Sequence, residues 1–210
     1  MSTWNGSDKS ATITLTGGSL IATATSSFNL GVRNTLYRST GKFYAEFSNL
    51  NWDSGCGVGL ADATYTLGSS TGSDVVMVVT GGGINSNGSA LASGLTDPAG
   101  AGHTVDIAVD LDAKLFWGRV DNGNWNGSGT ANPATGAGGI DLTWGGWSWT
   151  QLTPYTQLHI STGSGGTYND STTANFGGSA FAHTKPVGFS GWDGAGGGGG
   201  SSSSNWWFWL

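Results

Sequence analysis

Short stretches in which apolar and polar residues alternate recur along this chain, and this period of two constrains its fold more than any other feature. Residues 104–110 are the clearest example, because Val105, Ile107 and Val109 alternate with small or polar residues. Residues 114–120 follow after a turn at Asp112-Ala113. Alternation of this kind is typical of β-strands with one buried face, so the two segments predict a β-hairpin.

Further strands are predicted at 11–15, 42–50, 57–61, 74–80, 155–161 and 173–176. Turn-forming residues separate them, and 39 of the 210 residues are glycine. Glu, Lys, Gln, Arg and Met, which favour helices, together number only 12, so a helical protein is excluded. Many short strands at close spacing indicate an all-β sandwich or barrel. With 11 Trp, 8 Phe and 5 Tyr, its core is expected to be rich in aromatic rings.

The composition changes sharply after Trp192-Asp193. We expect one β domain over residues 1–193, a Gly/Ser linker over 194–205 and an aromatic tail over 206–210. The tail consists of Trp206, Trp207, Phe208, Trp209 and Leu210. Five apolar residues are too few to cross a bilayer, and exposed in water they would promote aggregation. They are therefore expected to dock on a partner or sister subunit, and the alternative is a tail folded back onto its own sandwich.

Charge and composition exclude several classes of function. The net charge is −6, the isoelectric point is about 4.6, and the seven Lys and Arg residues form no cluster, which argues against nucleic-acid binding. The single cysteine, Cys56, allows neither an internal disulfide nor a multi-cysteine metal site, and is expected to be a buried, inert thiol. No signal peptide and no membrane-spanning run are expected.

Carboxylate chemistry is poorly supported by the sequence. Glycosidases use a pair of carboxylates, but the chain has one glutamate, Glu46. Asp106 and Asp110 share one parity of a strand, with Asp112 nearby, and are expected to be solvated residues of an outer face. An enzyme is therefore not expected.

Nucleophilic and metal chemistry are equally poorly supported. The three histidines, at positions 103, 159 and 183, are scattered, and His159 is expected to face outward. The stretch that begins at Asp121 fails as a calcium loop, because Gly123 and Trp125 stand where oxygen ligands are needed. We expect no metal and no cofactor.

Four short motifs, in order, resemble the SPRY domain family. They are residues 41–47 (GKFYAEF) with 57–60 (GVGL), 102–105 (GHTV) with 107–112 (IAVDLD) and 115–117 (LFW), 121–123 (DNG), and 158–161 (LHIS) with 174–177 (ANFG) and Phe181. The resemblance spans Trp4 to Trp192, although Ala180 replaces the usual proline. It implies the two packed antiparallel sheets of the concanavalin A-like lectin and glucanase superfamily, a jelly-roll sandwich.

Within that family, the chain looks most like the branch found in bacteriophage and prophage structural proteins. The stretches that carry this are 4–15, 124–133 (NWNGSGTANP) and 161–166 (STGSGG). The resemblance implies a virion component such as a tail, fibre or decoration protein, made in the bacterial cytoplasm. Its expected partners are other virion proteins and sister subunits, in a homo-oligomer, with a host cell-surface glycan as a further ligand.

SPRY domains bind partners through loops at one side of the sandwich, which implies a loop surface here. The candidate residues are Trp52, Asp53, Tyr65, Trp125, Trp147 and Trp149. Flat aromatic rings with polar neighbours suit sugars and proteins alike. The primary hypothesis is a non-enzymatic virion protein that contacts host glycan or protein through this surface. The alternatives are a free-standing lectin, a weak glycosidase of the same superfamily, or a bacterial adaptor that binds a peptide.

Overall fold

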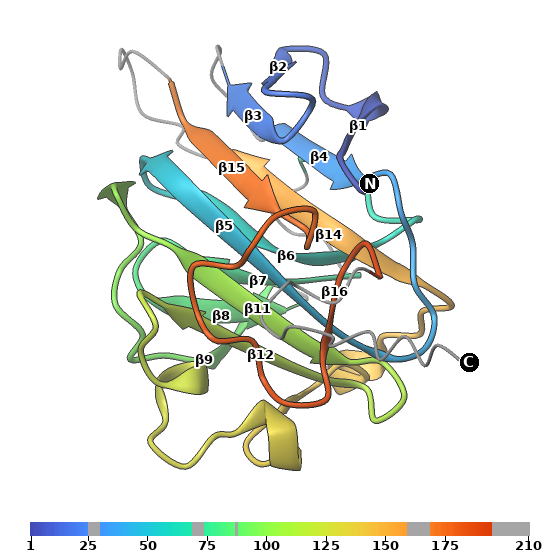
Figure 1. Ribbon diagram of the computed structural model, residues 1–210, viewed down its shortest axis with the longest axis vertical. Coiled ribbons are helices and arrows are strands. Elements are labelled where there is room, and N and C mark those ends of the chain that lie inside the picture. Colours follow the sequence, from blue (N-terminus) through green and yellow to red (C-terminus); the bar gives the residue numbers. More distant parts are fainter. Residues whose placement is uncertain (25–29, 69–73, 87, 159–168, 195–210) are drawn as a thin grey trace, which may run out of the picture.

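The computed structural model describes residues 1–24, 30–68, 74–86, 88–158 and 169–194, and they form two packed β-sheets (Figure 1). One sheet has seven strands in the order β1 (Trp4–Lys9), β4 (Leu30–Asn34), β14 (Leu152–Leu158), β6 (Gly57–Asp62), β7 (Val75–Val79), β8 (Gly83–Ser86) and β9 (Ser89–Ala92). All its strand pairs are antiparallel.

The second sheet has nine strands. Its main order is β13 (Ile140–Asp141), β12 (Leu115–Val120), β11 (Val105–Asp110), β5 (Lys42–Trp52), β15 (Ser171–Asn175), β3 (Ile21–Ala24) and β2 (Ile13–Thr16). Two further strands, β10 (Gly100–Ala101) and β16 (Ser190–Gly191), pair with β5. The expected antiparallel sandwich is thus confirmed, and among the strands of the described residues only the short β16 pairs in parallel.

The predicted hairpin at 104–110 and 114–120 is confirmed as β11 and β12. In the neighbouring pair, Val105 lies opposite Phe47, and Val109 lies opposite Phe43. All four side chains are buried in the space between the sheets. The period of two therefore places this face of the sheet toward the core. Cys56 is buried in the same core, as expected.

Aromatic rings fill much of that core, as the composition predicts. The Trp4 ring stacks near Phe47, with ring centroids 6.0 Å apart, and meets Phe176 edge-on at 5.1 Å. Phe43 packs against Trp192 at 5.2 Å. Each buried ring removes more apolar surface from water than an aliphatic side chain, so few aliphatic residues suffice.

Gly59 shows why small residues lie inside a central strand. It belongs to β6, which is paired on both sides by β14 and β7. A Cβ at this position would overlap the backbone carbonyl oxygen of Val76. Glycine is therefore required here by the close approach of two backbones.

Residues 176–194, which we call the strap, cross the outer face of the nine-stranded sheet (orange to red in Figure 1). The Trp192 amide donates to the Tyr44 carbonyl oxygen at 3.1 Å, and the Asp193 amide donates to that of Phe176 at 2.9 Å. Phe189 packs with Tyr44 and Trp117 in a second apolar cluster on this face. The sheet is thus covered on both sides along the strap.

The segment between β12 and β14 contains three 3₁₀ turns in addition to β13. These are η1 (Trp125–Gly127), η2 (Pro133–Thr135) and η3 (Trp144–Gly146). No strand was predicted in this segment from the sequence, so these short elements are new in the structure. Within the described ranges, no helix has the length and apolar character that crossing a membrane requires.

Several sequence predictions lie outside the described residues. They are the outward orientation of His159, the strand end at 159–161, the stretch 161–166, the linker after Gly194, and the tail Trp206–Leu210.

Candidate functional site

Three of the six predicted loop-surface residues are buried, so the prediction that they form an exposed surface is wrong. Trp52 ends strand β5 and is 3% exposed, and its indole N–H donates to the Thr172 hydroxyl at 3.1 Å. Tyr65 is 2% exposed and packs against Tyr155. Trp147 is 5% exposed and belongs to the main core. The alternation pattern and the neighbouring residues in the sequence do not indicate that these three side chains are buried.

The other three predicted residues are at least partly exposed, but each has different contacts. The Trp125 ring is half-buried beneath Arg119, whose guanidinium carbon lies 4.3 Å from the ring centroid. Trp149 is half-buried, with the Lys114 ammonium nitrogen 5.8 Å from its ring. Asp53 is exposed beyond the end of β5. Neither of the two cavities found among the described residues is lined by any of the three.

A buried polar cluster lies beneath the strap, and it corrects the expectation that Asp106 is solvated. Asp106 is on the outer face, as its parity predicts, but is fully buried. One of its oxygens accepts from Arg119 Nε at 2.6 Å, and the His183 Nδ1 lies 3.0 Å from both. Asp110 is also covered, and pairs with Lys42 at 2.8 Å. The strap that buries Asp106 comes from a distant part of the chain.

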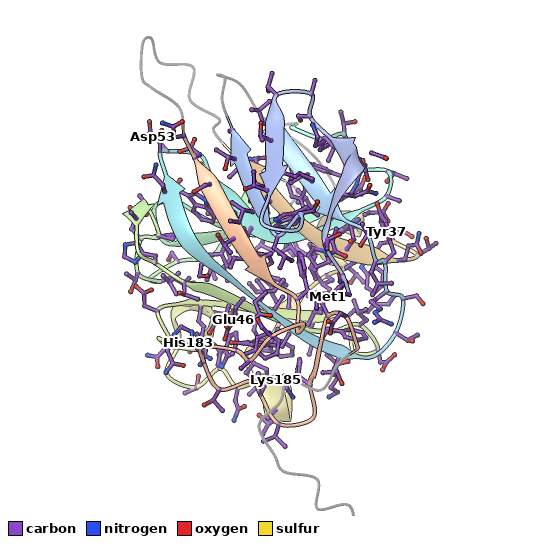
Figure 2. The ribbon with its side chains drawn as sticks, turned by 45° about the horizontal axis from the view of Figure 1, so that its top comes forward. Met1, Tyr37, Glu46, Asp53, His183 and Lys185 are labelled. Carbon is purple, nitrogen blue, oxygen red and sulfur yellow. The ribbon has the colours of Figure 1, made fainter. Side chains whose placement is uncertain are left out.

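Glu46 lies opposite Asp106 on the neighbouring strand, and Figure 2 shows it beside His183. Its carboxylate accepts the backbone N–H groups of Ala182 at 2.7 Å and His183 at 2.8 Å. The Tyr44 hydroxyl donates to it at 2.8 Å. Three donors from two elements therefore hold this side chain.

The ligand atoms of Glu46, Asp106 and His183 lie within 4.8 Å of one another, close enough to surround a metal ion. The contacts argue against that role, because Arg119 already supplies the positive charge beside Asp106. The same contacts argue against a glycosidase pair, since both carboxylates face donors of the protein under the strap. We assign the cluster to holding the strap on the sheet.

The pKa of the Asp106 carboxyl reflects its burial. Desolvation raises the pKa of its carboxyl above the ordinary value, and Arg119 and His183 oppose this rise in part. The Tyr44 hydroxyl also has a raised pKa, mainly through burial, with Asp106 and Glu46 adding to the effect. It remains a neutral donor to Glu46.

An open groove of about 440 Å³ lies where the edges of the two sheets meet. Strand β9 ends the seven-stranded sheet and β13 ends the nine-stranded one, and both contribute to it. The residues that line it are Leu91, Ala92, Asn126, Ser128, Gly138, Gly139, Ile140, Asp141 and Trp144. The groove therefore combines apolar walls with polar groups, as ligand-binding sites do.

Asn126 holds the floor of the groove in place. Its backbone has a φ of 51°, in the left-handed region that asparagine tolerates. Its side-chain oxygen accepts the Gly118 amide at 2.8 Å, and its nitrogen donates to the Gly138 carbonyl oxygen at 2.7 Å. The next residue, Gly127, has a φ of 68°, and a Cβ there would overlap the Ser93 carbonyl oxygen. The turn is thus fixed against both β12 and the end of β9.

Trp144 and Asp141 form the wall nearest to solvent. Trp144 is 43% exposed. Among the described residues, the other exposed large apolar side chains are those of Met1 and Val187. Asp141 is exposed, and its Oδ1 accepts both the amide and the hydroxyl of Thr143 at 2.7 Å. These bonds lower the pKa of its carboxyl, so it stays ionised at neutral pH.

Trp144 was not among the candidate residues selected from the sequence, although Trp147 and Trp149 nearby were. The signal that could have found it is local. Trp144 follows an Asp-Leu-Thr turn and precedes two glycines, Gly145 and Gly146, both with positive φ. In the structure, Trp144 at the start of this turn is exposed, whereas Trp147 directly after it returns to the core.

Comparison of the sequence with models of known protein families finds no match, and comparison with curated proteins finds none. Comparison with solved structures finds the same fold in the SPRY domain of human HERC1, with a TM-score of 0.59 and 13% identity, covering 81% of this chain and 96% of that one. The TRIM65 PSpry domain is similar too, with a TM-score of 0.56, 11% identity, and coverage of 83% and 91%. The SPRY-type fold is therefore confirmed, and the phage branch stays a prediction.

Proposed function

We propose that this chain is a non-enzymatic binding module of a bacteriophage virion that contacts host glycan through the groove between β9 and β13. The observation that carries the glycan-binding part is the exposed Trp144 ring beside the ionised Asp141 in an open groove. A flat indole face packs against the apolar face of a sugar ring, and a carboxylate accepts hydrogen bonds from its hydroxyl groups.

Two features support a role without catalysis. The carboxylates of Glu46 and Asp106, which lie close together, are both engaged beneath the strap. In the groove, Asp141 is the one carboxylate among the lining residues, whereas glycosidases place two carboxylates around the scissile bond.

The virion role rests on the resemblance of the sequence to phage structural proteins, and the tail is its expected point of attachment. A chain of this kind would sit in a symmetric array, so that many weak groove contacts act together. The main alternative is a free-standing lectin with the same groove. Mass spectrometry of purified phage particles separates the two, because only the virion protein copurifies with them.

The test of the groove is a glycan array probed with the full chain and with the Trp144→Ala variant. We expect the wild-type chain to bind a defined set of glycans and the variant to lose at least about tenfold in affinity, since stacked rings dominate such contacts. The matched control is Val187→Ala, which trims another exposed apolar side chain outside the groove. Silence of the wild-type chain on the array, or equal binding by Trp144→Ala, would refute glycan binding at this groove.

A further inference from the structure

The charge of the groove favours one class of glycan over another. Among the nine described residues that line it, Asp141 is the single charged one, and none is Lys, Arg or His. Its carboxylate is exposed, and the two hydrogen bonds from Thr143 keep it ionised at neutral pH. The chain as a whole carries a net charge of −6. The wall of the groove therefore presents a negative potential to a ligand.

The positive side chains of the protein are held elsewhere. All seven Lys and Arg residues belong to the described part of the chain, and none of them is among the residues that line the groove. Three of them pair with carboxylates: Arg33 with Asp8, Lys42 with Asp110 and Arg119 with Asp106. Three others donate to backbone carbonyl oxygens: Lys9, Arg38 and Lys185. An anionic ligand would thus meet no cation among the described residues of the groove wall.

Lys114 is the seventh, and its charge does act on Asp141. The next residue, Leu115, lies opposite Asp141 in the pairing of β12 with β13. The Lys114 ammonium nitrogen lies 5.8 Å from the centroid of the Trp149 ring. The hydrogen bonds from Thr143 lower the pKa of the Asp141 carboxyl most, and the charge of Lys114 contributes least. Lys114 therefore offsets the negative potential at Asp141 only in part.

The hydrogen-bonding chemistry of a carboxylate leads to the same ligand class. An ionised carboxylate accepts hydrogen bonds and has no proton to donate. A sugar hydroxyl group can donate to Asp141, whereas a carboxylate, sulfate or phosphodiester group on the ligand cannot, because it too is only an acceptor. Leu91, Ala92 and Ile140 add apolar surface on which sugar rings can pack. These walls suit a glycan whose polar groups are hydroxyl and amide groups.

We infer that the groove takes uncharged glycans and rejects those that place a carboxylate, sulfate or phosphodiester group against Asp141. This inference rests on the proposed glycan-binding function and names the ligand class of the same site. Hydroxyl groups of the sugar would donate to Asp141, and the ring would cover the apolar wall at Leu91 and Ile140. For a virion protein, this means attachment to neutral rather than acidic polysaccharide of the host surface.

The experiment is a glycan array of matched pairs. Each neutral oligosaccharide of glucose, galactose or mannose is printed beside the oligosaccharide of the corresponding uronic acid, in which a carboxylate replaces the CH₂OH group. At pH 7 both Asp141 and the uronic acid are ionised. We expect the full chain to bind the neutral member of a pair about tenfold more tightly than the acidic member. This ratio should shrink as salt is raised from about 0.05 M to about 0.5 M.

The Asp141→Asn variant tests whether this carboxylate sets the preference. It removes the charge and keeps an oxygen that can accept the hydrogen bonds from Thr143. The ratio of the two affinities should therefore fall to about one. Asp53→Asn is the matched control, because it removes the same charge from an exposed position beyond β5, outside the groove. It should keep the wild-type ratio.

The outcomes separate the inference from the function on which it rests. If the full chain binds acidic members as tightly as neutral ones, or more tightly, and Trp144→Ala loses this binding, the rejection of anions is wrong and glycan binding stands. A tenfold preference that persists in Asp141→Asn would also overturn the inference. If the full chain binds no glycan on the array, the proposed function and the inference both fail.

Discussion

Neighbouring tryptophans of one turn have opposite roles in this molecule. Trp147 is buried in the core and anchors the turn, whereas Trp144, three residues earlier, is the exposed ring of the groove. Residue type alone does not distinguish them, because tryptophan suits a core and a binding surface equally well. What separates them is the backbone path through Gly145 and Gly146, which turns one ring out and the next one in.

The buried pair of Asp106 and Arg119 leads to a stability prediction. Replacing Asp106 with Asn leaves the Arg119 guanidinium, whose side chain is 10% exposed, without its carboxylate partner. We expect the free energy of unfolding to fall by about 3–5 kcal/mol. Urea denaturation of the variant and of Asp53→Asn, which should change it by less than about 0.5 kcal/mol, measures this. Similar losses in the two variants would show that Asp106 does not hold the strap.

Asp110 predicts an acid dependence of stability. Burial alone would raise the pKa of its carboxyl, but the Lys42 ammonium and the Ala113 amide outweigh burial and lower it. Because the folded pKa lies below the unfolded one, the stabilisation is present above about pH 4 and is lost as the pH falls through the folded pKa. Asp110→Asn should therefore flatten the acid side of a plot of unfolding free energy against pH. An unchanged slope below pH 4 would contradict this.

Strands with a clear period of two could be predicted from the sequence, and those without it could not. The hairpin β11–β12 and the strands β6 and β7 lie where alternation or an apolar run predicted them. Strand β4, with the sequence LGVRN, is buried throughout and shows no alternation, so it was missed. The edge strands β9 and β13, which form the groove, are too short to carry a pattern.

The strap is the element that sequence reasoning could least foresee. Its contacts join residues far apart in the chain, such as Glu46 with Ala182 and His183. The outer face of a sheet is predicted to be exposed to solvent when the segment that covers it has no regular sequence pattern. For that reason the prediction that Asp106 lies on the outer face is right, and the prediction that it is exposed to solvent is wrong.

The strap predicts a local change in amide exchange. Glu46→Gln keeps the shape of the side chain but weakens the bonds to the Ala182 and His183 amides, because a neutral oxygen is a poorer acceptor than a carboxylate. Hydrogen exchange at these two amides should accelerate about tenfold. The Trp192 amide, which bonds to the Tyr44 carbonyl oxygen, should stay protected. Equal acceleration at all three would mean that the strap opens as one unit.

At the scale of the whole molecule, the sequence predicts a sandwich that is independent of the aromatic tail. Deleting residues 206–210 should leave the midpoint of thermal unfolding within about 2 °C of the full chain. It should remove self-association, which light scattering across a range of concentrations measures. If the shortened chain associates normally, docking by the tail is wrong. If it unfolds, the tail belongs to its own core.

The fold places the two edge strands of different sheets at one groove, and glycan contact at Trp144 is the central claim that follows. Fluorine NMR of the chain labelled with 5-fluorotryptophan tests it most directly, with the Trp144 resonance assigned from Trp144→Phe. On titration with an oligosaccharide selected from the array, this resonance should shift. Those of the buried Trp4, Trp117 and Trp192 should stay in place. A Trp144 resonance that does not move while the ligand is bound would contradict the account.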